Sequence, residues 1–148
     1  MLKADYLVIG AGAMGMAFAD EVISQSQNAQ LIIVDKRVWP GGHWNNAYEF
    51  VTLHQPALMY GVNSDRLEKD RYDLASGNRI CQYYKDVLKK LCATGRVQFF
   101  GQCAYDGEHR FHSLVDGQEY RVEVRKKLVN AAYSDVSVPS THKPNYSI

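Results

Sequence analysis

The strongest constraint on the fold is a strand-like run that leads directly into three spaced glycines near the start of the chain. Residues 5–15 read DYLVIGAGAMG, in which Gly10, Gly12 and Gly15 have the spacing Gly-x-Gly-x-x-Gly. A second apolar run, LIIV, ends in Asp35, twenty residues after the last glycine. In such a pattern the glycines make a tight turn, admit a pyrophosphate close to the backbone and let a helix pack on the strand. The pattern predicts a dinucleotide-binding β-α-β unit.

We call residues 10–15 the glycine loop and expect them to bind the phosphates, because free backbone N–H groups and the helix dipole favour an anion there. Asp35 would accept hydrogen bonds from the ribose hydroxyls. Two alternatives are a plain glycine-rich turn and a secretory signal that ends at Ala17-x-Ala19, although Asp5 and the interrupting glycines argue against a signal. The candidate binding residues of the loop are Gly10, Ala11, Gly12, Ala13, Met14 and Gly15.

Composition predicts one domain of ordinary size, since 46% of the 148 residues are hydrophobic and 22% are charged. A net charge of +1 gives no electrostatic basis for nucleic-acid binding, and no apolar run reaches the roughly eighteen residues that span a membrane. Cys81, Cys92 and Cys103 form no Cys-x-x-Cys pair. We interpret them as small core residues in a reducing compartment, which predicts a cytoplasmic protein.

The rest of the chain predicts a helix and several strands. Apolar residues at helical spacing run from a Ser76 cap to a Gly95 cap. Residues 97–103 predict a strand, and two β runs flank the Asp116-Gly117 turn. Residues 127–132 predict a further buried strand, whereas the charged residues 62–73 predict a loop or short surface helix.

The predicted fold class is therefore α/β, a Rossmann-like domain with a parallel sheet and a small antiparallel β-meander. We expect residues 1–135 to form the dinucleotide-binding domain. Residues 136–148 contain Pro139 and Pro144 and no apolar periodicity, which predicts an extended or disordered tail.

A second glycine motif follows at short distance. Asp35 is followed directly by Lys36 and Arg37, and then by Gly41-Gly42-His43-Trp44. With the glycine loop, this pattern resembles the N-terminal FAD domain of flavoproteins that have two dinucleotide-binding domains. The resemblance is strongest to the flavin-containing and Baeyer–Villiger monooxygenases and to their FAD/NAD(P)-binding relatives, and it covers nearly the whole chain.

The resemblance implies FAD rather than NAD as the cofactor. Paired glycines allow the backbone to approach a ligand, and an indole offers a flat apolar surface. By resemblance, Lys36, Arg37, Gly41, Gly42, His43 and Trp44 join the candidate site, and the backbone of Gln102, Cys103 and Ala104 would contact the adenine ring. The alternatives are a plain turn for the glycines and ordinary core packing for Trp44 and for Trp39.

Two departures from the resemblance matter for function. The sequence Asn130-Ala131-Ala132-Tyr133 stands where the family has Ala-Thr-Gly, which puts the turn beneath the flavin in doubt. No second glycine fingerprint follows, so NADPH or NAD would act only through a domain outside this chain. We therefore expect the FAD-binding domain of an NAD(P)H-dependent, monooxygenase-like oxidoreductase, in a truncated or split form. It would act as an enzyme only when completed by a second domain.

The alternative function is a non-catalytic FAD- or NAD-binding module that acts through a partner protein. The expected partners are FAD and, through an exposed interdomain face, a second polypeptide or a second copy of the chain. No catalytic constellation stands out. His109 and His112 would point to opposite faces of a strand, which argues against a metal site. His54 could line the flavin pocket, although a hydrogen-bonded structural role is the expected one.

Overall fold

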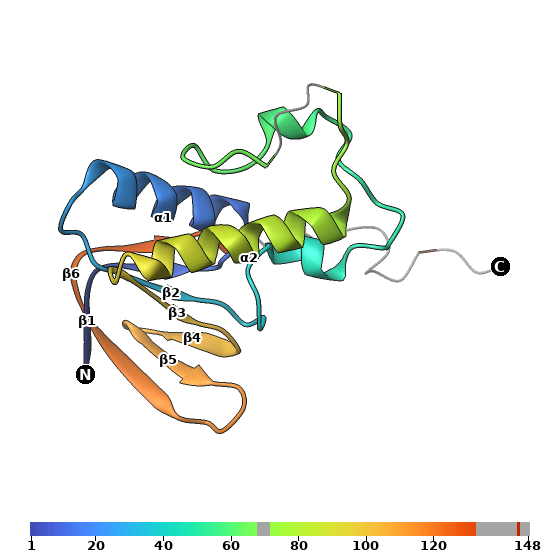
Figure 1. The fold of residues 1–148 in the computed structure, drawn as a ribbon. Coiled ribbons are helices and arrows are strands. Elements are labelled where there is room, and N and C mark those ends of the chain that lie inside the picture. Colours follow the sequence, from blue (N-terminus) through green and yellow to red (C-terminus); the bar gives the residue numbers. More distant parts are fainter. Residues whose placement is uncertain (68–71, 133–144, 146–148) are drawn as a thin grey trace.

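The computed structural model describes residues 1–67, 72–132 and 145 of the chain. Within them, six strands form a single sheet in the order β3-β2-β1-β6-β5-β4 (Figure 1). The helices are α1 (Ala13–Gln25), α2 (Gly77–Ala93) and the short 3₁₀ turns η1 (Gly42–Asn46) and η2 (Ala57–Met59). The strands are β1 (Leu2–Ile9), β2 (Leu31–Val34), β3 (Val97–Phe100), β4 (Cys103–Gly107), β5 (Arg110–Ser113) and β6 (Glu119–Asn130).

One half of the sheet is parallel and the other half is antiparallel, as the sequence predicts. β1 lies between β2 and β6 and is parallel to both, and β2 is parallel to β3. β5 pairs antiparallel with β4 on one side and with the first residues of β6 on the other. All four residues of β2 are buried, which is typical of a parallel strand covered on both faces.

The sheet separates two cores. On one face, α1 and α2 cover the sheet, and Val8, Ile33 and Tyr84 belong to the buried cluster there (Figure 1). On the other face, the β-meander of β4, β5 and the start of β6 folds beneath the sheet and closes a second cluster around Phe111. The domain therefore has three layers: helices, parallel sheet and β-meander.

Helix α2 confirms the sequence prediction for its position and its buried face. The Ser76 hydroxyl accepts a hydrogen bond from the Arg79 N–H at 3.4 Å, and Gly95 follows the helix with φ +71°. Both features are capping devices, because they satisfy backbone groups that the helix leaves unpaired. The apolar residues that recur at helical spacing are buried, namely Ile80, Val87, Leu88 and Leu91 with both Tyr83 and Tyr84.

Two strand predictions were wrong in their boundaries. The predicted strand 97–103 is broken after Phe100, because Gly101 passes the backbone of Val38 so closely that a Cβ would lie 2.7 Å from its carbonyl oxygen. Gln102 then turns with φ +52° and β4 begins at Cys103. The β run after the Asp116-Gly117 turn and the predicted strand 127–132 form one continuous strand, β6, which ends at Asn130. Its residues from position 127 onward are exposed or half-buried, so this part is not the buried strand that was predicted.

The residues described between η1 and α2 form loops apart from η2, and those described between 62 and 73 contain no helix, in agreement with the loop prediction. Asp20 on α1 anchors this loop, because its carboxylate accepts hydrogen bonds from the N–H group of Ser64 at 3.0 Å and from its hydroxyl. Asp65 forms an ion pair with Lys90 on α2. The predicted tail, 136–148, lies outside the described residues apart from Asn145.

Candidate dinucleotide-binding site

Two glycines of the glycine loop are required by the fold itself. Gly10 follows β1 with φ +100°, and a Cβ there would lie 2.9 Å from the carbonyl oxygen of Ala131 at the end of β6. Gly15 lies in the first turn of α1, where a Cβ would be 1.9 Å from the Gly10 carbonyl oxygen. Neither position has space for a side chain. The close contact between β1, α1 and β6 therefore depends on both glycines.

Gly12 is different, because neither its backbone angles nor its contacts with the described residues require a glycine there. Its backbone angles, φ −78° and ψ −171°, are extended values that any residue adopts. A Cβ at this position would meet the Gly42 Cα at 3.5 Å, which is an ordinary contact. The absence of a side chain at Gly12, which lies beside the N-terminus of α1, therefore relieves no close contact among the described residues.

The N-terminus of α1 has the character of an anion site. Gly12 is the N-cap residue, no side chain caps the helix, and its first turn contains no acidic residue. The first N–H groups of a helix have no partners inside it, and the dipole places partial positive charge there. Met14, in this first turn, has a 74% exposed side chain. The residues present thus fit a phosphate group.

The second glycine motif packs directly against the first. The Gly41 N–H donates a hydrogen bond to the Ala11 carbonyl oxygen at 2.9 Å. Gly42 has φ +56°, and a Cβ there would lie 3.0 Å from the Gly12 Cα. Gly41, with φ +114°, is also the N-cap of η1. The two glycine motifs, 30 positions apart in the sequence, therefore lie in direct contact beyond the end of β1.

Asp35 lies at the end of β2, beside the glycine loop. One carboxylate oxygen, Oδ2, accepts a hydrogen bond from the Ala11 N–H at 2.7 Å, and Oδ1 accepts one from the Arg37 N–H at 2.7 Å. The residue is only 7% exposed. The carboxylate thus binds two backbone amides of the chain, and its contact with ribose hydroxyls stays a prediction.

The predicted adenine-contacting segment lies next to Asp35. The Gln102 N–H donates to the Arg37 carbonyl oxygen, and the Cys103 N–H donates to the Asp35 carbonyl oxygen, each at 3.0 Å. The Leu114 N–H donates to the Gln102 carbonyl oxygen at 2.7 Å. Lys36 and Gln102 are exposed, Cys103 is buried and Ala104 is half-buried. The structure thus brings these residues to one edge, beyond the ends of β2 and β3.

Trp44 packs against the chain itself. Its indole N–H donates a hydrogen bond to the Tyr60 hydroxyl oxygen at 2.9 Å, and the ring packs on the core beneath the helices. These contacts agree with the alternative of core packing, and a contact with flavin stays a prediction. His43 is exposed, with its ring centroid 5.1 Å from that of Trp44. Trp39 is half exposed and lies under the Lys85 ammonium, 4.9 Å from the ring centroid.

The three cysteines are free thiols. Cys81 lies near the site, since a Cβ on Gly41 would be 3.5 Å from its Sγ atom. Burial raises the pKa of the Cys81 thiol, and the positive charge of Lys85 partly opposes that shift. Burial also raises the pKa of the Cys92 and Cys103 thiols. The thiols are therefore protonated at neutral pH, which makes them weak nucleophiles.

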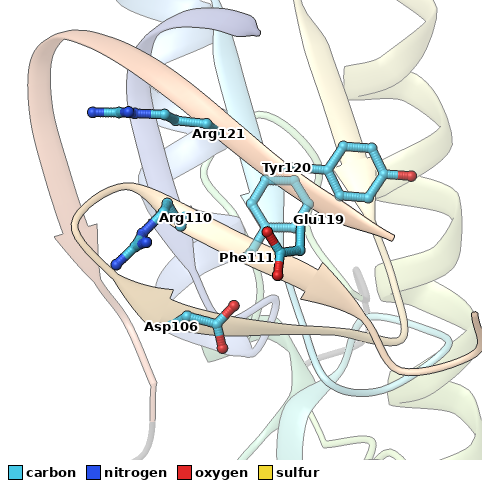
Figure 2. Close-up of a pocket in the computed structure, with 6 residues that line it drawn as sticks. All are labelled: Asp106, Arg110, Phe111, Glu119, Tyr120 and Arg121. Atoms are coloured by element: carbon cyan, nitrogen blue, oxygen red, sulfur yellow. The ribbon is translucent and has the colours of Figure 1, made fainter. Parts of the chain in front are cut away.

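A depression lies on the outer surface of the β-meander, at residues that no sequence motif marks (Figure 2). It measures about 460 Å³, and Arg110 and Arg121 face each other across the β5–β6 pair. Nearby, His112 pairs with Asp106 at 2.8 Å. His109, predicted on a strand, belongs to the β4–β5 turn with φ +60°. The depression shares no residue with the predicted site. The alternating charges along these strands are the sequence feature that could have indicated this depression.

The remaining site observations concern metals, membranes and His54. Among residues 1–67, 72–132 and 145, no group of three or more His, Cys, Asp or Glu side chains is arranged to hold a metal ion. No helix in the same part of the chain has the length and apolar character to cross a membrane. His54 is exposed in the loop before η2, and both its hydrogen-bonded structural role and a place in a flavin pocket stay predictions.

Comparison with curated proteins gives two informative relatives, whereas no family model matches the chain. Uncharacterized protein Rv2000 of Mycobacterium tuberculosis is 44% identical over 158 residues, which cover 99% of this chain and 29% of the relative. Uncharacterized oxidoreductase CzcO of Bacillus velezensis is 30% identical over 86 residues, or 58% of this chain and 24% of the relative. The chain thus spans less than a third of the length of the curated relatives that it matches.

Solved structures show the same fold at low sequence identity. A flavin-containing monooxygenase from Stenotrophomonas maltophilia matches with a TM-score of 0.66 and 20% identity, over 88% of this chain and 38% of that one. Bacillithiol disulfide reductase Bdr from Staphylococcus aureus matches with a TM-score of 0.68 and 16% identity, over 90% and 39%. The chain therefore has the Rossmann-like α/β fold of the FAD/NAD(P)-dependent oxidoreductases, and its structural neighbours include flavin monooxygenases.

Proposed function

We propose that this chain is the FAD-binding unit of an NAD(P)H-dependent flavoprotein oxidoreductase of the monooxygenase type. The observation that supports the proposal best is Gly12, a glycine that the fold does not require, at an uncapped helix N-terminus. A glycine at this place allows a pyrophosphate to approach the backbone. The flavin-containing monooxygenase among the structural neighbours supports FAD as the dinucleotide.

In this proposal the two glycine motifs hold the pyrophosphate, and the edge formed by Lys36, Arg37 and residues 102–104 holds the adenosine half. The contact between Gly12 and Gly42 and the hydrogen bond between Gly41 and Ala11 bring the two glycine motifs together. When bound, the flavin would supply the redox chemistry, since protein groups in flavoenzymes bind and orient the cofactor. The contribution of this chain is therefore binding and orientation. Because its cysteines are free thiols, we also propose a cytoplasmic location.

We further propose that additional polypeptide, in the same chain or a second one, completes the enzyme and supplies its NADPH site. One edge of β6 supports this. On the edge of β6 that faces away from β1, β5 covers only the first residues, Glu119–Arg121. Among the described residues, no strand pairs with that edge from Glu123 onward. Leu128, on this stretch, is 38% exposed. Unpaired strand edges favour the addition of a further strand.

Calorimetric titration with three nucleotides tests the cofactor proposal. FAD and ADP should each bind the folded chain, and ADP should compete with FAD, because the proposed contacts are to the pyrophosphate and adenosine. FMN, which lacks adenosine, should not compete at the same concentrations. If neither FAD nor ADP binds while circular dichroism shows a folded chain, the proposed function is wrong. If NAD competes more strongly than FAD, the chain is instead an NAD-binding module.

A further inference from the structure

We propose that Trp44, Tyr60 and Tyr84 form a relay for single electrons, which carries an oxidising equivalent from the second glycine motif into the helical core. This inference goes beyond the proposed function, because the relay needs no particular nucleotide at the site. It starts from one hydrogen bond, in which the Trp44 indole N–H donates to the Tyr60 hydroxyl oxygen at 2.9 Å. Indole and phenol side chains can each lose one electron and one proton and later regain both.

The three rings are in contact with one another. The ring centroids of Trp44 and Tyr60 are 6.4 Å apart, and those of Tyr60 and Tyr84 are 6.2 Å apart, both in edge-to-face geometry. The polar atoms of each pair are also hydrogen-bonded, since the Tyr60 hydroxyl binds both the indole and the Tyr84 hydroxyl. The same residues therefore provide a short path for an electron and a hydrogen-bonded path for a proton.

The relay begins beside the candidate site and leads away from it. Trp44 lies in η1, whose first residue, Gly42, packs against Gly12. Tyr60 directly follows η2 and is half-buried. Tyr84 lies on α2 and is only 1% exposed. The Tyr60 hydroxyl thus joins an indole next to the two glycine motifs to a phenol inside the core.

The surroundings of Tyr84 decide which form of the oxidising equivalent can travel. Burial, together with the hydrogen bond to Tyr60, raises the pKa of the Tyr84 hydroxyl, so a phenolate does not form there at neutral pH. A positively charged radical in the same core would be costly for the same reason, because the core solvates charge poorly. Each electron that moves along the relay must therefore be accompanied by a proton.

The hydrogen bond between Trp44 and Tyr60 allows this coupled step. A one-electron oxidant of the radical class takes an electron from the Trp44 indole and is reduced, and the indole loses its N–H proton to water. The Nε1 atom is then an acceptor. Tyr60 returns one electron to the indole and its hydroxyl proton to Nε1, so Trp44 is restored and Tyr60 becomes a neutral phenoxyl radical. Tyr84 can restore Tyr60 in the same way, with no change in net charge.

Pulse radiolysis of the folded chain tests the relay without any nucleotide. The azide radical oxidises indoles preferentially, and indolyl and phenoxyl radicals absorb at different wavelengths. All samples carry Trp39→Phe, which removes the other tryptophan of the chain. The indolyl signal should decay while the phenoxyl signal rises at the same rate, and this rate should not depend on protein concentration. The rate should fall in deuterated water, because the step moves a proton.

Tyr60→Phe keeps the ring and removes the hydroxyl that binds the indole. The concentration-independent transfer should be lost in this variant. Tyr120→Phe is the matched control, because Tyr120 is also half-buried but packs with Phe100 and Phe111 in the cluster on the other face of the sheet. This control should transfer at the same rate as the chain with Trp39→Phe alone.

Two results would overturn the relay. One is unchanged transfer in a Tyr60→Phe chain that circular dichroism shows to be folded. The other is an equal transfer rate in ordinary and deuterated water, which decides the question even if Tyr60→Phe does not fold. Because no nucleotide is present, a chain that binds no FAD would refute the proposed function and leave this test unaffected.

Discussion

The substitution Gly12→Ala separates ligand binding from folding. Alanine is allowed at φ −78°, and its Cβ would lie 3.5 Å from the Gly42 Cα, in ordinary contact. The change at an N-cap costs at most about 1 kcal/mol, which lowers the melting temperature of a domain of this size by about 2–4 °C. The methyl group would nevertheless occupy the surface that a pyrophosphate approaches. A steric cost of about 1–3 kcal/mol corresponds to a roughly 5- to 150-fold loss of FAD affinity.

Gly15→Ala is the opposite control on the same loop. Its Cβ would lie 1.9 Å from the Gly10 carbonyl oxygen, so the start of α1 must move by about 1 Å, at a cost of several kcal/mol. Thermal unfolding and FAD titration of both variants give the comparison. We expect Gly12→Ala to lose affinity and keep its fold, and Gly15→Ala to lose stability. A Gly12→Ala chain that binds FAD as tightly as the parent would refute the reasoning.

Three further predictions concern stability and association. Tyr83→Phe should destabilise the chain by about 1–3 kcal/mol, because the Tyr83 hydroxyl accepts a hydrogen bond from the Val62 N–H at 2.6 Å and donates one to the Asp65 carbonyl oxygen. An unchanged midpoint of urea denaturation would contradict this prediction. Burial raises the pKa of Tyr83 from 10.0 to about 12, so the unfolded chain loses this proton at lower pH than the folded chain. The free energy of unfolding should therefore fall as the pH rises from 10 to 12, and it should fall less steeply in Tyr83→Phe. Sedimentation should show concentration-dependent dimers, since Tyr48, Phe50 and Met59 are exposed, whereas a monomer at all concentrations would argue against self-association.

The local patterns predicted the β-α-β unit, helix α2 and the two-part sheet, because each depends on short-range features. The three spaced glycines, the buried run LIIV and the Ser76 cap are examples that can be recognised within a few residues. The break between β3 and β4 could not be predicted in this way. It depends on Gly101 passing the backbone of Val38, a contact between segments more than sixty residues apart.

In the candidate site, too, local patterns were predictable from the sequence and long-range contacts were not. The sequence predicted which segments belong to it, but it could not show that Gly42 packs on Gly12 or that Gly41 binds Ala11. It gave each glycine of the loop its own role, and the structure adds the close backbone contacts that require Gly10 and Gly15 and that are absent at Gly12 among the described residues. The double hydrogen bonding of Asp35 depends on the relative placement of two strand ends, which no local pattern reports.

The most direct test of the central proposal is the flavin content of the purified chain after incubation with FAD and gel filtration. Binding of a whole FAD predicts a protein peak with a flavin absorption spectrum at close to one flavin per chain. The Gly12→Ala variant should elute at the same volume with much less flavin. A colourless peak from a folded parent chain would contradict the proposal that this domain binds FAD.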